Sequence, residues 1–292
     1  MMLRSVVLAG LILSAFLSDA SAQTNYVTVT NYVTVTQVVT NYVTVTNFPA
    51  KAAQLAGDGK PPAAKVVAPQ KFPWNRTLTA GVTLTRGNSD SLLATAKLFA
   101  DKKTPLNEFT LGGDATYGSA NGIENSEIFH GFGQWNHLFS ERWYAYLRGE
   151  GVHDGIAEIK YRATLTSGMG YYFIKDGTNT TLAGELGPGL VLERVGTVDT
   201  TYATMRVAER FDHKFNKGSA RIWENVEFLP QIDKPSDYLI NSEIGVESAL
   251  YKTLSLQVFL DDNFNSQPAI ASDGVKLKRN DVKLVSGITY KF

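Results

Sequence analysis

Four histidines are the first candidates for catalysis or metal binding in this chain of 292 residues. His130 and His137 are seven positions apart, which puts them on opposite faces of a strand. His153 and His213 are isolated from them, and neither a His-x-His nor a His-Glu-x-x-His spacing occurs. The chain has no cysteine, so thiol chemistry and Cys-ligated metals are excluded. We therefore expect the histidines to be interior or rim residues of a β-structure rather than metal ligands.

Two further patterns suggest chemistry but have structural explanations. A hydrolase of the Ser-His-acid type needs its three groups on one face, and the outward positions expected around Phe129, Trp135 and His137 bring no serine to that face. The glycines between Gly184 and Gly189 resemble a phosphate-binding loop, but they alternate within an expected strand and no helix pattern follows. We expect close packing there. The sequence thus predicts no enzyme, no cofactor and no metal site.

The charges balance, with Lys and Arg totalling 28 and Asp and Glu totalling 28. A net charge of zero removes the electrostatic argument for a nucleic-acid partner. The distribution of the charges along the chain is more informative than their total.

The first 22 residues have the three parts of a bacterial signal peptide. Arg4 supplies the positive start, Ser5 to Leu17 forms an apolar stretch too short for a stop-transfer helix, and Ala20-Ser21-Ala22 is a cleavage site. We expect export from the cytoplasm and a mature chain that begins near Gln23.

Residues 23–48 contain three copies of Asn-Tyr-Val-Thr-Val-Thr, at 25–30, 31–36 and 41–46. The alternation places Tyr and Thr on one face of an extended segment and Val and Asn on the other. A disordered spacer and a strand that pairs with another copy are both compatible with this pattern. The second interpretation predicts a homo-oligomer through residues 25–48. Residues 49–73 are rich in Pro, Ala and Lys and form an expected linker.

From Trp74 onward, segments of alternating character are separated by turn signals, and no second apolar run is long enough for a membrane helix. We expect strands at 74–85, 91–101, 107–118, 126–138, 142–153, 159–174, 179–193, 201–213, 219–230, 238–250, 253–265 and 281–292. Such a chain can cross a membrane only as a closed barrel. The predicted fold is all-β: a transmembrane antiparallel up-and-down barrel of about twelve strands over residues 74–292.

The connections between these strands alternate in length. Those expected over Ser119–Asn125, Arg194–Thr200 and Ser266–Asn280 are longer than their neighbours. Outer-membrane barrels have short periplasmic turns and longer external loops. An even number of strands then places the N-terminal segment and the C-terminus in the periplasm.

The final strand has the features of an outer-membrane assembly signal. The chain ends in Phe292, with Tyr290 two residues before it and Gly287 five before it. We expect the barrel-assembly machinery to read these three residues and outer-membrane lipid to surround the barrel.

Several stretches resemble one known family. They are Gly87-Asn88-Ser89-Asp90, Ser236 to Val246, Asn265-Ser266-Gln267-Pro268 and the Tyr290-Lys291-Phe292 end. Residues 74–292 resemble the salt-induced outer-membrane protein family, which is domain of unknown function 481. The resemblance implies a barrel in the bacterial outer membrane and brings no settled activity.

Alternation along the strands collects charged residues on the inward face. It predicts a lumen ion-pair lattice of Glu150, Arg162, Glu185, Glu193, Arg206, Arg210, Asp212, Arg221, Glu227 and Glu247. In the expected register, Arg162 lies between Glu150 and Glu193, Arg206 opposite Glu227, Arg210 diagonal to Glu185, and Arg221 between Asp212 and Glu247. The alternative is a set of separately solvated lumen charges. Glu224 falls on the outward face, which indicates a bulge or a different register.

These observations favour a passive narrow channel for small polar solutes or a structural envelope barrel. An envelope protein that anchors through its repeat, a barrel phospholipase and a soluble β-barrel binding protein are the alternatives. Membrane fractionation, conductance and lipid cleavage distinguish them.

Overall fold

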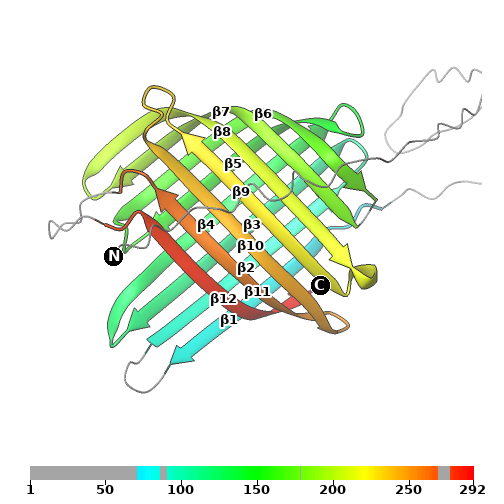
Figure 1. Cartoon of the computed structure of the whole chain (residues 1–292), viewed down its shortest axis with the longest axis horizontal. Coiled ribbons are helices and arrows are strands. Elements are labelled where there is room, and N and C mark those ends of the chain that lie inside the picture. The colour runs from blue at the N-terminus through cyan, green and yellow to red at the C-terminus, as the bar shows by residue number, and fades with distance from the viewer. Residues whose placement is uncertain (1–70, 86–90, 178, 269–276) are drawn as a thin grey trace, which may run out of the picture. The chain divides into compact units, whose positions relative to one another are not determined.

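The computed structural model describes residues 71–85, 91–177, 179–268 and 277–292. In these ranges the chain forms a closed barrel of antiparallel strands, β1 to β12 (Figure 1). The strands are β1 (Asn75–Thr85), β2 (Ser91–Lys103), β3 (Asn107–Ala120), β4 (Ile123–Leu138), β5 (Trp143–Asp154), β6 (Ile159–Asp176), β7 (Thr180–Val195), β8 (Val198–Phe215), β9 (Ala220–Pro230), β10 (Tyr238–Tyr251), β11 (Leu254–Asn265) and β12 (Asn280–Lys291). The predicted fold is confirmed. The expected signal peptide and repeat lie outside the described residues, as does the linker up to residue 70.

Each strand pairs with its neighbours in sequence, and β12 closes the barrel against β1. Thr77 lies opposite Lys291 in this last pairing, and the Phe292 amide donates to the Arg76 carbonyl at 3.1 Å. Closure gives every strand a hydrogen-bonded neighbour on both sides. Both ends of the barrel sequence therefore lie at the same rim, here called the proximal rim, and the opposite rim is the distal rim.

Two of the three loops expected to be long are instead tight turns. Asn121 and Gly122 alone separate β3 from β4, with φ of 52° and 78°, and Gly196, with φ of 58°, opens the turn between β7 and β8. Residues that adopt positive φ make the turns whose twist matches a hairpin. The strands consequently extend beyond their expected ends. The longer distal connections are 231–237 and 266–279.

Alternation between the two faces holds through most of each strand, and the pairing shifts locally between β3 and β4, β5 and β6, β6 and β7, and β10 and β11. In β7, Glu185 is buried in the lumen, whereas Leu186, Leu190 and Leu192 are exposed on the outside. The bulge or register change expected at Glu224 is wrong, because β9 pairs without a shift with both β8 and β10. Glu224 faces outward, and Glu209 of β8 is its diagonal neighbour on the same surface.

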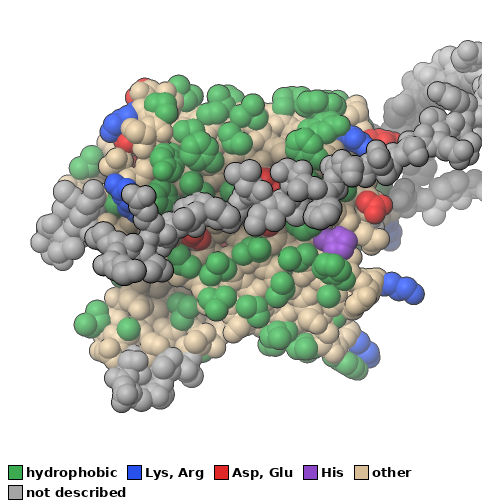
Figure 2. Space-filling view, in the orientation of Figure 1, with side chains coloured by type: hydrophobic (Ala, Val, Ile, Leu, Met, Phe, Trp, Pro, Cys, Tyr) green, Lys and Arg blue, Asp and Glu red, His purple; other side chains and the backbone are tan. Residues whose placement is uncertain are grey.

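The outer surface is apolar, with aromatic residues gathered near the rims. Figure 2 shows hydrophobic side chains over much of one face, with charged groups mainly towards its ends. Near the proximal rim, Tyr171 packs against Trp143 at 4.7 Å and against Phe173 at 5.2 Å between ring centroids. Such rings are typical of a barrel that meets lipid headgroups. Among the described residues, no helix is long and apolar enough to cross a membrane.

Glycines in the wall make room for aromatic side chains inside the lumen. A Cβ on Gly245 would lie 2.1 Å from the Trp223 ring, and a Cβ on Gly170 would lie 2.2 Å from the Tyr144 ring. Both rings therefore lie flat against a neighbouring strand. This arrangement lets bulky residues line the wall and leaves space at the centre for polar contacts.

Candidate functional site

The centre of the lumen holds a buried ion pair between β7 and β8. Arg206 is 1 % exposed, and its Nη1 donates to Glu185 Oε2 at 2.6 Å. The Arg206 Nε donates to Glu227 of β9 at 2.5 Å, and the Tyr146 ring lies 5.1 Å from the guanidinium carbon. Burying a charge is costly unless it is paired and hydrogen-bonded. Arg206 meets that requirement with two carboxylates.

Glu185 is also contacted from several strands. The Tyr144 hydroxyl donates to it at 2.9 Å, and Arg210 Nη2 donates to it at 3.0 Å. Gln134 of β4 donates to the same carboxylate at 2.8 Å and accepts from Arg210. Glu185 is therefore surrounded by donors, although its side chain is entirely buried.

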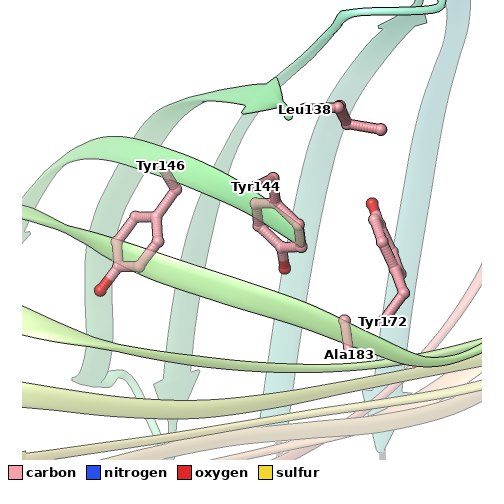
Figure 3. Close-up of a cluster of buried hydrophobic side chains, with 5 residues drawn as sticks. All are labelled: Leu138, Tyr144, Tyr146, Tyr172 and Ala183. Atoms are coloured by element: carbon pink, nitrogen blue, oxygen red, sulfur yellow. The ribbon is translucent and has the colours of Figure 1, made fainter. Parts of the chain in front are cut away.

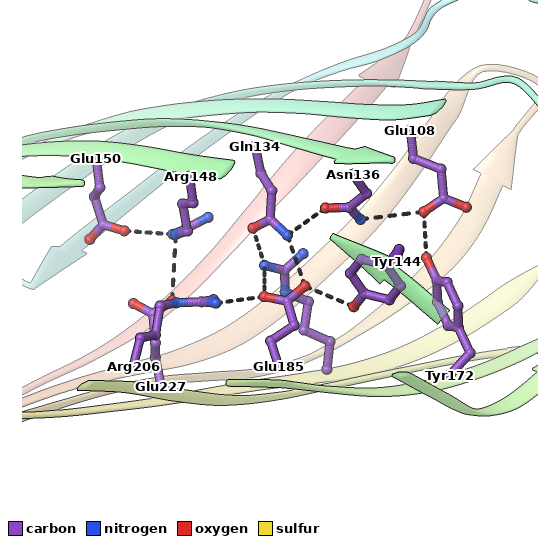
Figure 4. A network of polar contacts seen from close by, with 11 residues as sticks. Glu108, Gln134, Asn136, Tyr144, Arg148, Glu150, Tyr172, Glu185, Arg206 and Glu227 are labelled. Atoms are coloured by element: carbon purple, nitrogen blue, oxygen red, sulfur yellow. Dashed lines mark hydrogen bonds and ion pairs between the residues drawn. The ribbon is translucent and has the colours of Figure 1, made fainter. Parts of the chain in front are cut away.

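These contacts cross the lumen rather than follow its wall (Figure 4). Gln134 in β4 reaches Glu185 in β7, and Arg148 in β5 contacts Glu227 in β9 at 3.4 Å. The strands so joined are separated in the barrel by at least two others. We call this group the main crossbar, and it consists of Gln134, Arg148, Glu185, Arg206, Arg210 and Glu227.

A layer of tyrosines fills the lumen on the proximal side of the main crossbar. Tyr144, Tyr146 and Tyr172 form a buried cluster with Leu138 and Ala183 (Figure 3). The Tyr172 hydroxyl donates to Glu108 of β3. Asn136, next to Gln134 on the inward face of β4, donates to the same carboxylate at 3.4 Å. The filling thus combines packed rings with hydrogen bonds from the Tyr144, Tyr172 and Asn136 side chains, which fix these groups in place.

A second crossing joins β2 to β10. Lys97 contacts Glu243, and the Trp223 Nε1 donates to Glu243 at 2.7 Å. The Lys97 ammonium also lies 4.8 Å from the centroid of the Phe259 ring. We call Lys97 and Glu243 the second crossbar.

The ion-pair lattice expected from the sequence can be located in the structure. Arg162 contacts Glu193 at 2.6 Å, Arg206 contacts Glu227, and Arg210 contacts Glu185. Arg221 lies between Asp212 and Glu247, at 2.5 and 3.9 Å.

The expected position of Arg162 between two glutamates is wrong in one respect. Glu150 lies opposite Thr164, and it binds Arg148 at 2.6 Å and His130 at 3.4 Å. The pairing of β5 with β6 shifts between Val152 and Asp154, and this irregularity could not be located from the turn.

Several lumen residues were missed by reasoning from charge alone. Gln134, Asn136 and Tyr144 are uncharged but hold the centre of the network, and His130 bonds Asp114 at 2.8 Å. The sequence signal for these residues was their position in the strand alternation, which places them on the inward face. A search for polar residues of every kind on the inward face would have included them.

The remaining histidines have ordinary contacts. His137 on the outer face lies beside Asn107, at 3.1 Å, and His213 contacts Thr180 at 2.8 Å. Within the described ranges, no group of three or more His, Asp or Glu side chains is arranged to hold a metal ion.

Residues 78–292 match the model of the family described as "Protein of unknown function, DUF481". The chain belongs to this family. The match covers nearly the whole barrel and confirms the resemblance seen in the motifs. No curated protein matches the DUF481 chain in sequence.

The DUF481 barrel is similar in form to several solved structures. The NanC porin is 5% identical, with 75% of this chain and 100% of that chain covered and a TM-score of 0.45. The KdgM porin in complex with disordered oligogalacturonate is 10% identical, with 75% and 99% covered and a TM-score of 0.41. The translocator domain of the autotransporter NalP from Neisseria meningitidis is 12% identical, with 75% and 87% covered and a TM-score of 0.40. The fold of the DUF481 chain rests on its own strand pairing.

Proposed function

We propose that this DUF481 barrel spans the bacterial outer membrane and acts as a narrow passive channel for small polar solutes. The observation that carries the proposal is the contrast between its two faces. The outside exposes Leu98, Leu165, Leu186 and Leu284, whereas the inside is lined by hydrogen-bonded polar and charged groups. An apolar band around a polar lumen is the pattern of a membrane barrel.

The crossbars define the kind of channel. A barrel of this strand number lies between small barrels filled by side chains and wide porins, so its interior residues control the passage of water. Here the main crossbar and the second crossbar both cross the lumen. Positive and negative groups are paired, as in Arg206 with Glu185 and Lys97 with Glu243. We expect low conductance with weak ion selectivity.

The test is electrical recording from the purified full-length chain in planar lipid bilayers. We expect small, stable current steps, and a heat-denatured sample of the same preparation is the control. Absence of current from protein that remains heat-modifiable on gels would contradict the channel and favour a structural barrel. An assay of phospholipid cleavage on the same sample would detect an enzyme.

Two features of the assembled protein belong to this proposal. We propose that the proximal rim faces the periplasm, because the longer connections 231–237 and 266–279 leave the distal rim. We also propose that the assembly machinery reads the final strand. Tyr290 and Phe292 point outward with ring centroids 5.9 Å apart, while Gly287 faces the lumen and approaches Ala80 of β1.

A further inference from the structure

Solvent reaches the lumen-facing side chains very unevenly. In the sector formed by β5 to β8, five inward residues are almost completely buried: Tyr144, Thr166, Val191, Thr204 and Arg206. This sector lies on one side of the main crossbar. Its centre is filled by these side chains.

The proximal and middle part of the sector formed by β1, β11 and β12 is also filled. Thr79, Gln257 and Thr289 bond to one another at 2.8 to 3.2 Å. Phe259 and Val285 pack with Trp223 in a buried cluster. This sector lies on the far side of the second crossbar.

Between the two filled sectors, inward side chains are open to solvent. Asn225 of β9 shares its face with buried Trp223 and with Glu227 of the main crossbar, so it points into the lumen, yet it is exposed. Its partners in the neighbouring strands are Arg210 and Glu243. The exposed fraction of the Arg210 side chain is 28 %, compared with 2 % for Arg206.

The two crossbars bound this open strip. The main crossbar runs from β4 and β5 to β7, β8 and β9, and the second runs from β2 to β10. The strip between them has β3 on one side and β9 on the other. Asp114 of β3, with 21 % of its side chain exposed, faces it from the first wall, and Asn225 faces it from the second.

We propose that solutes cross the barrel through the strip between the two crossbars, and that Asn225 lies on the wall of this path. The inference rests on the proposed channel function and deepens it. The lining includes an amide at Asn225, a guanidinium at Arg210 and a carboxylate at Asp114. The charged groups have partners: Arg210 pairs with Glu185, and Asp114 bonds to His130. Such a wall suits small neutral or zwitterionic solutes that hydrogen-bond, and favours neither cations nor anions.

The natural lack of cysteine makes the path testable by labelling. Asn225→Cys places a thiol in the open strip, and Thr204→Cys in β8 is the matched control in the filled sector, where Thr204 is 0 % exposed. Both are small replacements on the inward face. In lipid vesicles, a water-soluble methanethiosulfonate reagent should modify the N225C protein at least about tenfold faster, because reaction at a buried position requires local opening.

Recording from the same proteins links labelling to transport. Modification of the N225C protein should reduce the current, whereas treatment of the T204C protein should leave it unchanged. As a second measurement, Asn225→Asp and Asn225→Lys should shift the reversal potential in a salt gradient in opposite directions.

The outcomes separate the inference from the proposed function. A normal current from an N225C protein whose introduced thiol does not react, or whose modification has no effect, would overturn the path and leave the channel standing. Absence of current from the unmodified wild-type chain would overturn the channel itself. Equal reaction rates at the two positions would show that the lumen is not divided as inferred.

Discussion

At the scale of single residues, charged side chains such as Glu185 and Arg206 are buried and paired on the lumen face of the wall. Glu185 is buried in the lumen and receives hydrogen bonds from Arg206, Arg210, Gln134 and Tyr144. Removing one partner of a buried ion pair leaves an uncompensated charge, which costs about 3–5 kcal/mol. Removing a lumen arginine is therefore costly, and the side chain also occupies part of the barrel cross-section.

Replacing Arg162 and Arg206 together with Ala should raise the conductance and shift selectivity towards cations. Two side chains leave the lumen, and Glu193 and Glu227 lose partners, at 2.6 and 2.5 Å respectively. Only the heat-modifiable, folded fraction should be recorded, because Glu185 also loses its contact with Arg206. Reversal potential and single-channel current are the measurements.

Arg194→Ala is the matched control for this prediction. Arg194 follows Glu193 in β7 but points outward, where it contacts Asp199 at 3.8 Å. Its loss should leave both electrical quantities unchanged. Recordings of the double variant that match the wild type would refute the role of the lumen arginines.

At the scale of elements, β6 and β7 meet through glycines. A Cβ on Gly187 would lie 2.0 Å from the Ser167 carbonyl oxygen, and one on Gly168 would lie 2.1 Å from the Leu186 carbonyl oxygen. The regular pairing of β6 with β7 is interrupted here: Thr166 pairs with Gly189 and Met169 pairs with Leu186, but the residues between them are not paired. Pro188 in this stretch has no amide to donate. The backbones therefore approach closely at the point where a ladder bond is missing.

Gly187→Ala should destabilise the barrel by about 1–3 kcal/mol, because backbone atoms cannot move aside for the added methyl group. Urea unfolding in detergent micelles, followed by tryptophan fluorescence, measures this loss. Gly149→Ala is the control, since a Cβ at Gly149 meets nothing within 4 Å. The control should be neutral or stabilising by up to about 1 kcal/mol. Equal stability of the two variants would contradict the close approach.

At the scale of the whole molecule, closure places both ends of the barrel sequence at the proximal rim. The seam between β1 and β12 pairs from Thr77 with Lys291 to Ala80 with Ile288, which is a short stretch compared with other neighbours. The final residues contribute to this seam directly. They are also the expected assembly signal.

Deleting Phe292 should leave the protein in the periplasm in a protease-sensitive form that is not heat-modifiable. The aromatic ring would no longer be available to the assembly machinery, and the hydrogen bond from the Phe292 amide to the Arg76 carbonyl would be lost. Fractionation and gel mobility measure the outcome. Phe215→Ala removes another exposed proximal aromatic residue and should assemble normally. Normal outer-membrane levels of the truncated chain would refute the signal.

Orientation can be tested with two cysteines at opposite rims. Asp233→Cys lies in the distal connection after β9, and Lys217→Cys lies in the proximal turn after β8. A membrane-impermeant maleimide added to intact cells should label the first and spare the second. Labelling at Lys217→Cys alone would reverse the proposed orientation.

The sequence alone determined the class of fold, the strand order and the face of most residues. These features depend on the two-residue period of a strand, which is local and can be read along the chain. The alternation predicts that Glu185 faces inward, and the structure agrees. The lengths of the turns were harder to predict from the sequence. The tight Asn121-Gly122 turn allows β3 and β4 to extend beyond the ends that the apolar pattern indicated.

The tertiary structure decided which side chains meet across the lumen. Gln134 and Glu185 are 51 positions apart, and Lys97 and Glu243 are 146 apart. Their contact depends on the width of the closed barrel and on the stagger summed over every intervening strand pair, including the bulge near Val152. A local pattern specifies that a residue faces inward, but only closure specifies what it faces. The crossbars and the open strip between them follow from that closure.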